Sequence, residues 1–215
     1  MLEDVIEVAP PQTVHRFASR PRATDRLSEI ARDGGLDDDA LRETLEFLGP
    51  ADGEAEQLLA GPFQPKPQLE GKWHPSRYTN GDWPVFYGAL EPETSEAEIV
   101  HHLDAGQMKA ALSVGRPVYY SLFHCTFDGR ALDLRPKLPA WSWLTDPNTK
   151  DSRCQALGRE AHENSVDGFL APSARKSDGT SVPVFIRGRL SQPVIERDAE
   201  FSPNPATGTV QVRYL

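Results

Sequence analysis

The sequence predicts an α+β fold, with a central mixed or antiparallel β-sheet flanked by helices. Short runs rich in aromatic and β-branched residues predict strands, and they are separated by stretches with the apolar spacing of helices. The two kinds of element do not alternate in the regular βαβ rhythm of a doubly wound sheet. The 215 residues are enough for one domain with a well-buried core, so we expect a single domain spanning residues 1–215.

The expected strands start at residues 12–18, where polar and apolar side chains alternate. The run 117–127 is expected to be a central strand, and Asp128-Gly129 is expected to turn it into a hairpin with 130–134. The late segments 188–195 and 209–215 are candidates for edge strands. The other expected strands are 84–89, 168–172 and 182–186.

Helices are expected where apolar residues recur with a period near that of the α-helix. The strongest pattern spans 94–112, and Gly115-Arg-Pro117 ends it. Further helices are expected at 24–33, 38–48 and 149–164. Between residues 51 and 80, proline and glycine are frequent and periodicity is poor, which predicts a long irregular insertion. Loops of that length are often functional.

The charge balance limits the classes of partner. The chain has a net charge of −9 and a pI near 5.2, which argues against direct nucleic-acid binding, because such binding relies on Lys and Arg neutralising phosphates. The acidity suits a basic protein partner. No apolar run approaches the roughly 20 residues that span a bilayer, and the acidic start lacks the pattern of a signal peptide. We therefore expect a cytoplasmic protein without membrane contact.

Three side chains at regular intervals form the strongest functional signal. Arg77 is followed by Tyr87 after ten residues and by Glu98 after eleven more, with the expected strand 84–89 between them. A cation, an aromatic ring and a carboxylate on adjoining elements suit chemistry on NAD+. Each residue also has an ordinary structural reading: Ser95-Glu-Ala-Glu98 fits a capping box, a single arginine is usually solvated, and a strand tyrosine is usually part of the core.

Two further residues could belong to the same cleft. Arg16, on the opening strand, could make bidentate contacts with a pyrophosphate. His102 follows Glu98 by four residues and shares its helical face, although a partly buried histidine with a satisfied ring is the more ordinary reading. We expect no metal site, because His101-His102 and His124-Cys125 are adjacent pairs whose side chains diverge, and no zinc-type spacing links them.

The region from Arg77 to His102 resembles the RES-domain family, named for its arginine, glutamate and serine. The residues that carry the resemblance are Arg77-Tyr78-Thr79, Gly81, Val85-Phe86-Tyr87 and Glu98. Later, Gly168-Phe-Leu-Ala-Pro-Ser173 followed by Val184-Phe185 is similar to the serine-bearing strand of the family and its partner, and His15-Arg16-Phe17 to its first strand. The family arginine could instead align with Lys72, but the ten-residue distance to Tyr87 favours Arg77.

The resemblance implies a fold related to ADP-ribosyltransferases and a toxin whose antitoxin is an Xre-like helix-turn-helix protein. Such toxins deplete NAD+ by hydrolysis or phosphorolysis, and NAD+ is then a substrate, attacked by water or inorganic phosphate, with no further cofactor. It implies that Arg77 and Arg16 hold the phosphates and Tyr87 packs against the nicotinamide–ribose end. Glu98 would stabilise positive charge, and Ser173 would bind the substrate or orient Glu98. A mono-ADP-ribosyltransferase and a non-catalytic binding module are the alternatives, and an oligomer is possible.

Overall fold

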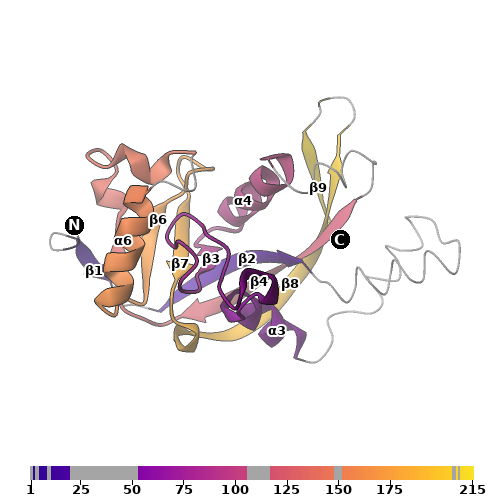
Figure 1. The fold of residues 1–215 in the computed structure, drawn as a ribbon. Coiled ribbons are helices and arrows are strands. Elements are labelled where there is room, and N and C mark those ends of the chain that lie inside the picture. Colours follow the sequence, from indigo (N-terminus) through magenta and orange to yellow (C-terminus); the bar gives the residue numbers. More distant parts are fainter. Residues whose placement is uncertain are drawn as a thin grey trace, which may run out of the picture.

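The computed structural model describes residues 2, 5–8, 11–19, 53–105, 117–147, 152–204, 207 and 209–215. These residues form a mixed α+β structure built on one sheet, as the sequence predicts (Figure 1). The strands are β1 (Ile6–Val8), β2 (Gln12–Ser19), β3 (Phe86–Ala89), β4 (Val118–Phe127), β5 (Ala131–Asp133), β6 (Gly168–Pro172), β7 (Thr180–Val184), β8 (Leu190–Pro203) and β9 (Val210–Tyr214). The α-helices are α3 (Glu54–Ala60), α4 (Pro92–Ala105) and α6 (Ser152–Glu163).

The strands lie in the order β1-β5-β6-β7-β3-β2-β4-β8-β9. All neighbouring pairs are antiparallel except β5 and β6, which are parallel. The chain passes from β5 to β6 through a crossover that contains α6, as parallel neighbours require. The crossover also contains two short 3₁₀ helices, η3 (Arg135–Lys137) and η4 (Ser142–Thr145). This crossover contacts Arg77 and the turn that carries it, as described below.

Strand β4 buries side chains on both of its faces. Successive side chains of a strand point to opposite faces, so Leu122 and Phe123 of β4 enter different cores. Phe123 lies in one cluster with Leu59 of α3, and Leu122 lies in another with Leu103 of α4. Helices α3 and α4 therefore cover opposite faces of β2 and β4 (Figure 1). A third cluster joins α6 to β6 through contacts that include Leu157 and Phe169.

Strands β2 and β3 separate soon after they meet. His15 pairs with Ala89, whereas β3 pairs with β7 along its length, from Phe86 with Val184 to Ala89 with Ser181. Beyond His15, strand β2 continues beside β4 on its other side. The sheet thus splits between β2 and β3, and the split leaves room for a cavity between two neighbouring strands.

Three expected strands pair differently from the prediction. The predicted hairpin of 117–127 with 130–134 is wrong, because β5 pairs with β1 and β6 and not with β4. The amide of Asp128 donates to the carbonyl of Arg189, so the turn leads the chain away from β4. The expected edge strand 188–195 is also wrong. Strand β8 is longer and lies between β4 and β9, which leaves β9 at the edge.

Two expected helical features also need correction. The stretch 51–80 is not wholly irregular, because it contains α3 and the 3₁₀ helices η1 (Gly61–Phe63) and η2 (Pro67–Leu69). Leu59 of α3 is fully buried, and this burial stabilises a helix too short to form alone. Helix α4 begins at Pro92 rather than at residue 94. The expected helices 24–33 and 38–48, and residues 106–112, lie outside the described residues.

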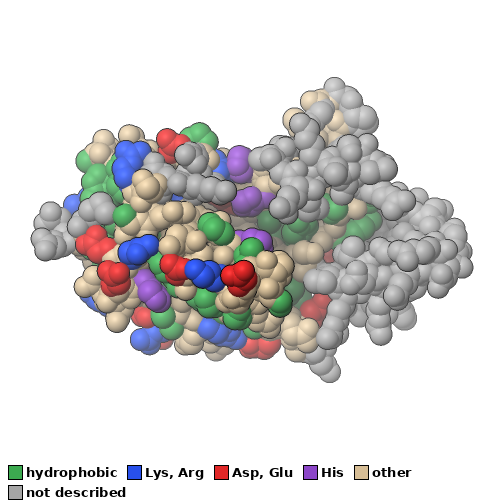
Figure 2. Space-filling view, in the orientation of Figure 1, with side chains coloured by type: hydrophobic (Ala, Val, Ile, Leu, Met, Phe, Trp, Pro, Cys, Tyr) green, Lys and Arg blue, Asp and Glu red, His purple; other side chains and the backbone are tan. Residues whose placement is uncertain are grey.

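Acidic and basic side chains are interspersed on the described part of the face in Figure 2, and no continuous basic area covers it. None of the described helices is long and apolar enough to cross a membrane. Cys125 and Cys154 are both buried.

Candidate active site

A cavity of about 240 Å³ lies where β2 and β3 separate. It brings together residues that are far apart in the sequence. Its lining residues come mainly from β2, β3, α4, the turn 76–79 and the loop after β6. Five of the six predicted site residues line it, namely Arg16, Arg77, Tyr87, Glu98 and His102. The sixth, Ser173, is buried next to it and donates a hydrogen bond of 3.3 Å to Oε1 of Glu98.

Arg16 spans the gap between the two separating strands. Its Nη1 donates to the carbonyl of Tyr87 over 2.6 Å, and its guanidinium carbon lies 5.0 Å from the centroid of the Phe86 ring. Burial lowers the pKa of Arg16 to about 10, so the side chain still carries its charge at neutral pH. On the next residue of β2, the amide of Phe17 donates to the hydroxyl of Ser95 on α4. Side chains thus replace the strand pairing that is lost at the split.

Arg77 stands on a tight turn held from two sides. The amide of Ser76 donates to the carbonyl of Thr79 over 2.8 Å and closes the turn. Nε2 of Gln155, on α6, donates to the carbonyls of the same two residues. Gly158, one turn further along α6, allows the helix to pack closely against the turn that carries Arg77. A Cβ at this position would lie 2.0 Å from the carbonyl oxygen of Tyr78. The turn therefore presents Arg77 to the cavity in one defined position.

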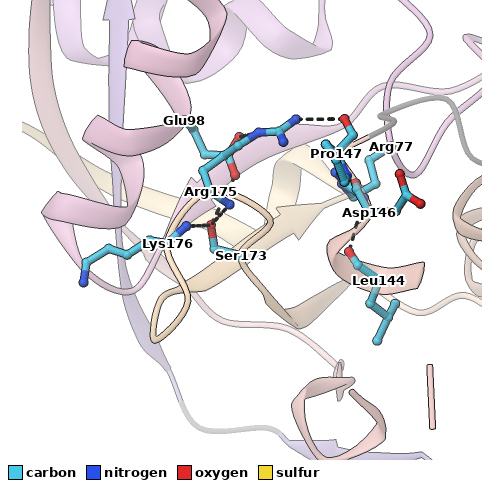
Figure 3. Close-up of polar contacts among 8 residues, drawn as sticks. All are labelled: Arg77, Glu98, Leu144, Asp146, Pro147, Ser173, Arg175 and Lys176. Atoms are coloured by element: carbon cyan, nitrogen blue, oxygen red, sulfur yellow. Dashed lines mark hydrogen bonds and ion pairs between the residues drawn. The ribbon is translucent and has the colours of Figure 1, made fainter. Parts of the chain in front are cut away.

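The guanidinium of Arg77 also contacts the crossover between β5 and β6. Nη1 donates to the carbonyl of Leu144 over 3.2 Å and Nη2 to that of Asp146 over 2.7 Å (Figure 3). Lys72, the alternative for the family arginine, pairs instead with Asp82 over 3.1 Å and has a side chain that is 64% exposed. Lys72 does not line the cavity. The geometry therefore places Arg77, and not Lys72, at the site.

Tyr87 supports the turn that carries Arg77. Its hydroxyl accepts the backbone N–H of Tyr78 over 3.0 Å and shares a hydrogen bond of 2.7 Å with the hydroxyl of Ser76. Burial raises the pKa of Tyr87 to about 12, so the phenol stays protonated. The hydroxyl is thus engaged by the protein. What Tyr87 presents to the cavity is its aromatic ring.

Glu98 lies in the second turn of α4, so the alternative reading of Ser95–Glu98 as a capping box does not hold. The helix begins with a proline at its first position, a favoured place for proline. Ser95 is inside the helix and buried, where it accepts the amide of Phe17. The carboxylate of Glu91 acts at the helix start instead, accepting the hydroxyl of Thr94 over 2.7 Å and the amide of Thr180 over 2.9 Å. Glu98 is therefore not used as a cap and faces the cavity.

The surroundings of Glu98 shift its pKa in opposite directions. Burial raises the pKa of Glu98 above its usual range, while the positive charges of Arg175 and Arg77 and the hydroxyl of Ser173 oppose that rise. Oε2 lies 3.8 Å from Nε of Arg175. The result is a carboxyl group with a raised pKa, held between a hydroxyl donor and two cations.

Arg175 is a site residue that the sequence analysis missed. It follows β6 directly and lines the cavity, and its side chain is only 7% exposed. Its Nη2 donates to the carbonyl of Pro147 over 3.3 Å, and the amides of Arg175 and Lys176 both donate to Oγ of Ser173 (Figure 3). The available signal was Ser173-Ala-Arg175-Lys176 directly after an apolar strand, since a serine there commonly organises the turn that follows.

His102 lines the outer part of the cavity and is exposed. Partial burial and the nearby charges of Arg175 and Arg16 lower its pKa, so its imidazole is neutral at pH 7. The cations at the site are thus Arg16, Arg77 and Arg175. Together with one carboxylate and an aromatic ring, they can bind an anionic group and stabilise positive charge that develops close to the carboxylate.

One comparison with known proteins identifies the family of this chain. Among solved structures, the chain is similar to the toxin–antitoxin complex MbcT–MbcA of M. tuberculosis, with 17% sequence identity and a TM-score of 0.46, over 88% of this chain and 86% of that chain. The search of curated protein sequences gave no match. The sequence matches the RES domain over residues 48–203, which is most of the chain. The protein therefore belongs to the RES domain family.

Proposed function

We propose that the protein is a RES-type toxin that binds NAD+ and cleaves its nicotinamide–ribose bond, by hydrolysis or phosphorolysis. One observation carries the proposal: the carboxylate of Glu98 faces the same cavity as the guanidiniums of Arg16, Arg77 and Arg175. Cleavage of this bond needs a place for a diphosphate and a negative group near the ribose. The cavity offers both within one small volume.

The three arginines are suited to the diphosphate. A guanidinium presents N–H donors in a planar fork that matches phosphate oxygens. Arg77 and Arg175 currently donate to carbonyls of residues 144–147, and these neutral acceptors bind a guanidinium more weakly than a phosphate would. The ring of Tyr87 then lies beside the nicotinamide–ribose end of the substrate.

Glu98 stabilises the transition state electrostatically. As the C1′–N bond lengthens, its electron pair moves onto the nicotinamide nitrogen, and the ribose gains oxocarbenium character that an ionised Glu98 stabilises. Nicotinamide leaves as a neutral molecule, so no strong general acid is required. Water or inorganic phosphate then attacks C1′, and with water the proton is released to solvent. Ser173, through its hydrogen bond to Oε1, holds the carboxylate in position.

The products of NAD+ cleavage test the proposal directly. Purified protein is incubated with NAD+, with and without phosphate and cell lysate, and the products are separated by chromatography. Free ADP-ribose supports hydrolysis, and ADP-ribose 1″-phosphate supports phosphorolysis. Labelled lysate protein would instead indicate mono-ADP-ribosyl transfer. Stable NAD+ under all conditions would contradict the proposal and favour a non-catalytic binding module.

The toxin role is tested in cells. Expression of the wild type is expected to lower cellular NAD+ and stop growth, whereas Glu98→Gln is expected to do neither. An antitoxin of the Xre-like helix-turn-helix class is the expected partner, as the family membership suggests, and the net charge of −9 suits a basic protein. Growth that stays normal while wild-type protein accumulates would contradict the toxin role.

A further inference from the structure

A second cavity of about 620 Å³ adjoins the candidate active site. Its outer wall comes from the region between Arg16 and Arg77, chiefly α3, η1 and residues 64–79. The two cavities share the residues at their junction, which are Arg16, Phe17, Ser76, Tyr87 and Ile99. They are therefore two adjoining compartments, with Arg16 and Tyr87 at their junction.

The second compartment has the character of a site for a flat ring. About half of the residues that line it are aromatic or aliphatic, and they include Trp73, Tyr120, Leu58, Pro62 and Val85. The amide side chains of Gln57 and Gln64 stand at the exposed rim. Ligand sites of this composition bind an apolar ring by burial and orient it with a small number of polar groups.

The sizes of the compartments match the two ends of a dinucleotide. The first, at about 240 Å³, falls below the roughly 300–1,000 Å³ of ordinary ligand sites, whereas the two together fall within it. Arg16 lines both compartments. Its Nη1 bonds the carbonyl of Tyr87, and its Nε has no acceptor among the described residues. A diphosphate is the middle of a dinucleotide, so a cation at the junction is placed for it.

We propose that the second compartment binds the adenosine half of the dinucleotide, with the diphosphate at Arg16 and the nicotinamide ribose beside Glu98. This assignment rests on the proposed function. It gives residues 54–79 a role in substrate selection, because they supply the wall against which the base packs.

A truncated substrate tests the assignment. Nicotinamide mononucleotide keeps the bond that is cleaved but lacks the adenosine half. Gln64→Trp is designed to fill the second compartment, and Gln68→Trp is its matched control, because Gln68 is an exposed glutamine of the same region that lines neither cavity. Stacking of a base on aromatic side chains contributes about 1–3 kcal/mol, so loss of the adenosine contacts is expected to change kcat/KM about tenfold to a hundredfold.

Three results are expected. The wild type cleaves NAD+ more efficiently than nicotinamide mononucleotide. Gln64→Trp lowers kcat/KM for NAD+. The same variant leaves kcat/KM for the mononucleotide within about twofold of wild type, because this substrate does not reach the changed wall. Gln68→Trp changes neither. Gln57→Trp, from the exposed face of α3, repeats the test at a second position of the rim.

Binding of adenosine 5′-monophosphate gives a readout that does not depend on catalysis. Titration calorimetry with the Glu98→Gln protein is expected to show binding that Gln64→Trp weakens about tenfold or more, equivalent to the loss of one stacking contact. A wild type that cleaves neither substrate contradicts the proposed function and this assignment with it. Cleavage of NAD+ that Gln64→Trp and Gln57→Trp leave unchanged overturns only the adenosine site.

Discussion

Arg16 donates from Nη1 to the carbonyl of Tyr87 over 2.6 Å, across the gap where β2 and β3 separate. A strand that leaves its neighbour exposes backbone groups that cost free energy if they are buried without a partner. Here a side chain satisfies the carbonyl, and its guanidinium remains at the cavity. The same residue therefore closes the split in the sheet and supplies one of the cations of the site.

Replacing Glu98 with glutamine is expected to reduce kcat for NAD+ cleavage by about 10²–10³-fold, the usual effect of removing one electrostatic contact to a transition state. KM is expected to change little, because the substrate binds mainly through the arginines. Glu93→Gln is the control, since Glu93 is an exposed carboxylate in the first turn of the same helix. Equal loss of activity in both variants would show that the effect is not specific to the cavity.

The raised pKa of Glu98 predicts opposite pH dependences for activity and stability. The ionised form acts in catalysis, so kcat should rise with pH through the raised pKa. The folded state holds the proton more tightly than the unfolded state. The contribution of Glu98 to the free energy of unfolding is therefore fully present below its unfolded pKa and is lost as pH rises through the folded pKa. Denaturant unfolding of wild type and Glu98→Gln at several pH values measures this contribution, and a wild type that gained stability relative to Glu98→Gln as pH rose would contradict it.

Arg175→Ala is expected to move the acid limb of the kcat profile to higher pH. The charge of Arg175 lowers the pKa of Glu98, so its removal lets burial raise that pKa further. A pH–rate profile separates this effect from simple loss of substrate binding, which would lower kcat/KM at every pH. Lys176→Ala is the neighbouring control, because Lys176 pairs with Asp178 and its side chain does not line the cavity.

Tyr87→Phe removes the hydroxyl that holds the turn of Arg77. The N–H of Tyr78 then loses its acceptor, which costs about 1–3 kcal/mol of unfolding free energy. KM for NAD+ is expected to rise because Arg77 is held less firmly. Tyr119→Phe, which removes a hydroxyl bonded to Glu200 between β4 and β8, serves as the comparison. An unchanged KM in Tyr87→Phe would mean that the turn keeps its position without this hydroxyl.

Gly158→Ala tests the contact between α6 and the same turn. Alanine in place of a glycine within a helix ordinarily stabilises it by about 1 kcal/mol. Here the added Cβ would lie 2.0 Å from the carbonyl oxygen of Tyr78, so we expect a net loss of about 1–3 kcal/mol from overpacking. Gly188→Ala is matched to it, because nothing lies within 4 Å of the added Cβ there. Thermal unfolding of both variants gives the comparison, and stabilisation by Gly158→Ala would rule out the close contact.

Features of the fold and of the candidate site were predictable where local pattern and chemistry coincide. The spacing of Arg77, Tyr87 and Glu98 predicted residues that line one cavity, since the turn, the strand and the helix that carry them follow one another directly. The α+β class and the strand 168–172 were also predicted correctly. Whether these residues have the chemical roles suggested by the family resemblance stays a prediction.

The errors come from contacts that local sequence does not encode. The segment 130–134 has the composition of a hairpin partner, but its buried Ala131 and Leu132 pack against residues that come much later in the chain. The Ser95–Glu98 capping pattern was overridden because Pro92 and Glu91 start the helix earlier. The side chain of Arg175 is positioned by Glu98 and Pro147, which are distant in the sequence.

The pairing of β3 with β7 has a consequence for synthesis of the chain. Tyr87 pairs with Pro183, so the strand that carries Tyr87 gains this neighbour only after β7 has emerged from the ribosome. Ser173 and Arg175, which flank Glu98, also emerge late. A nascent or prematurely terminated chain that stops before β7 holds Arg77, Tyr87 and Glu98 without the frame that brings them together. Such fragments are therefore expected to be inactive, and only nearly full-length molecules are expected to have the proposed activity.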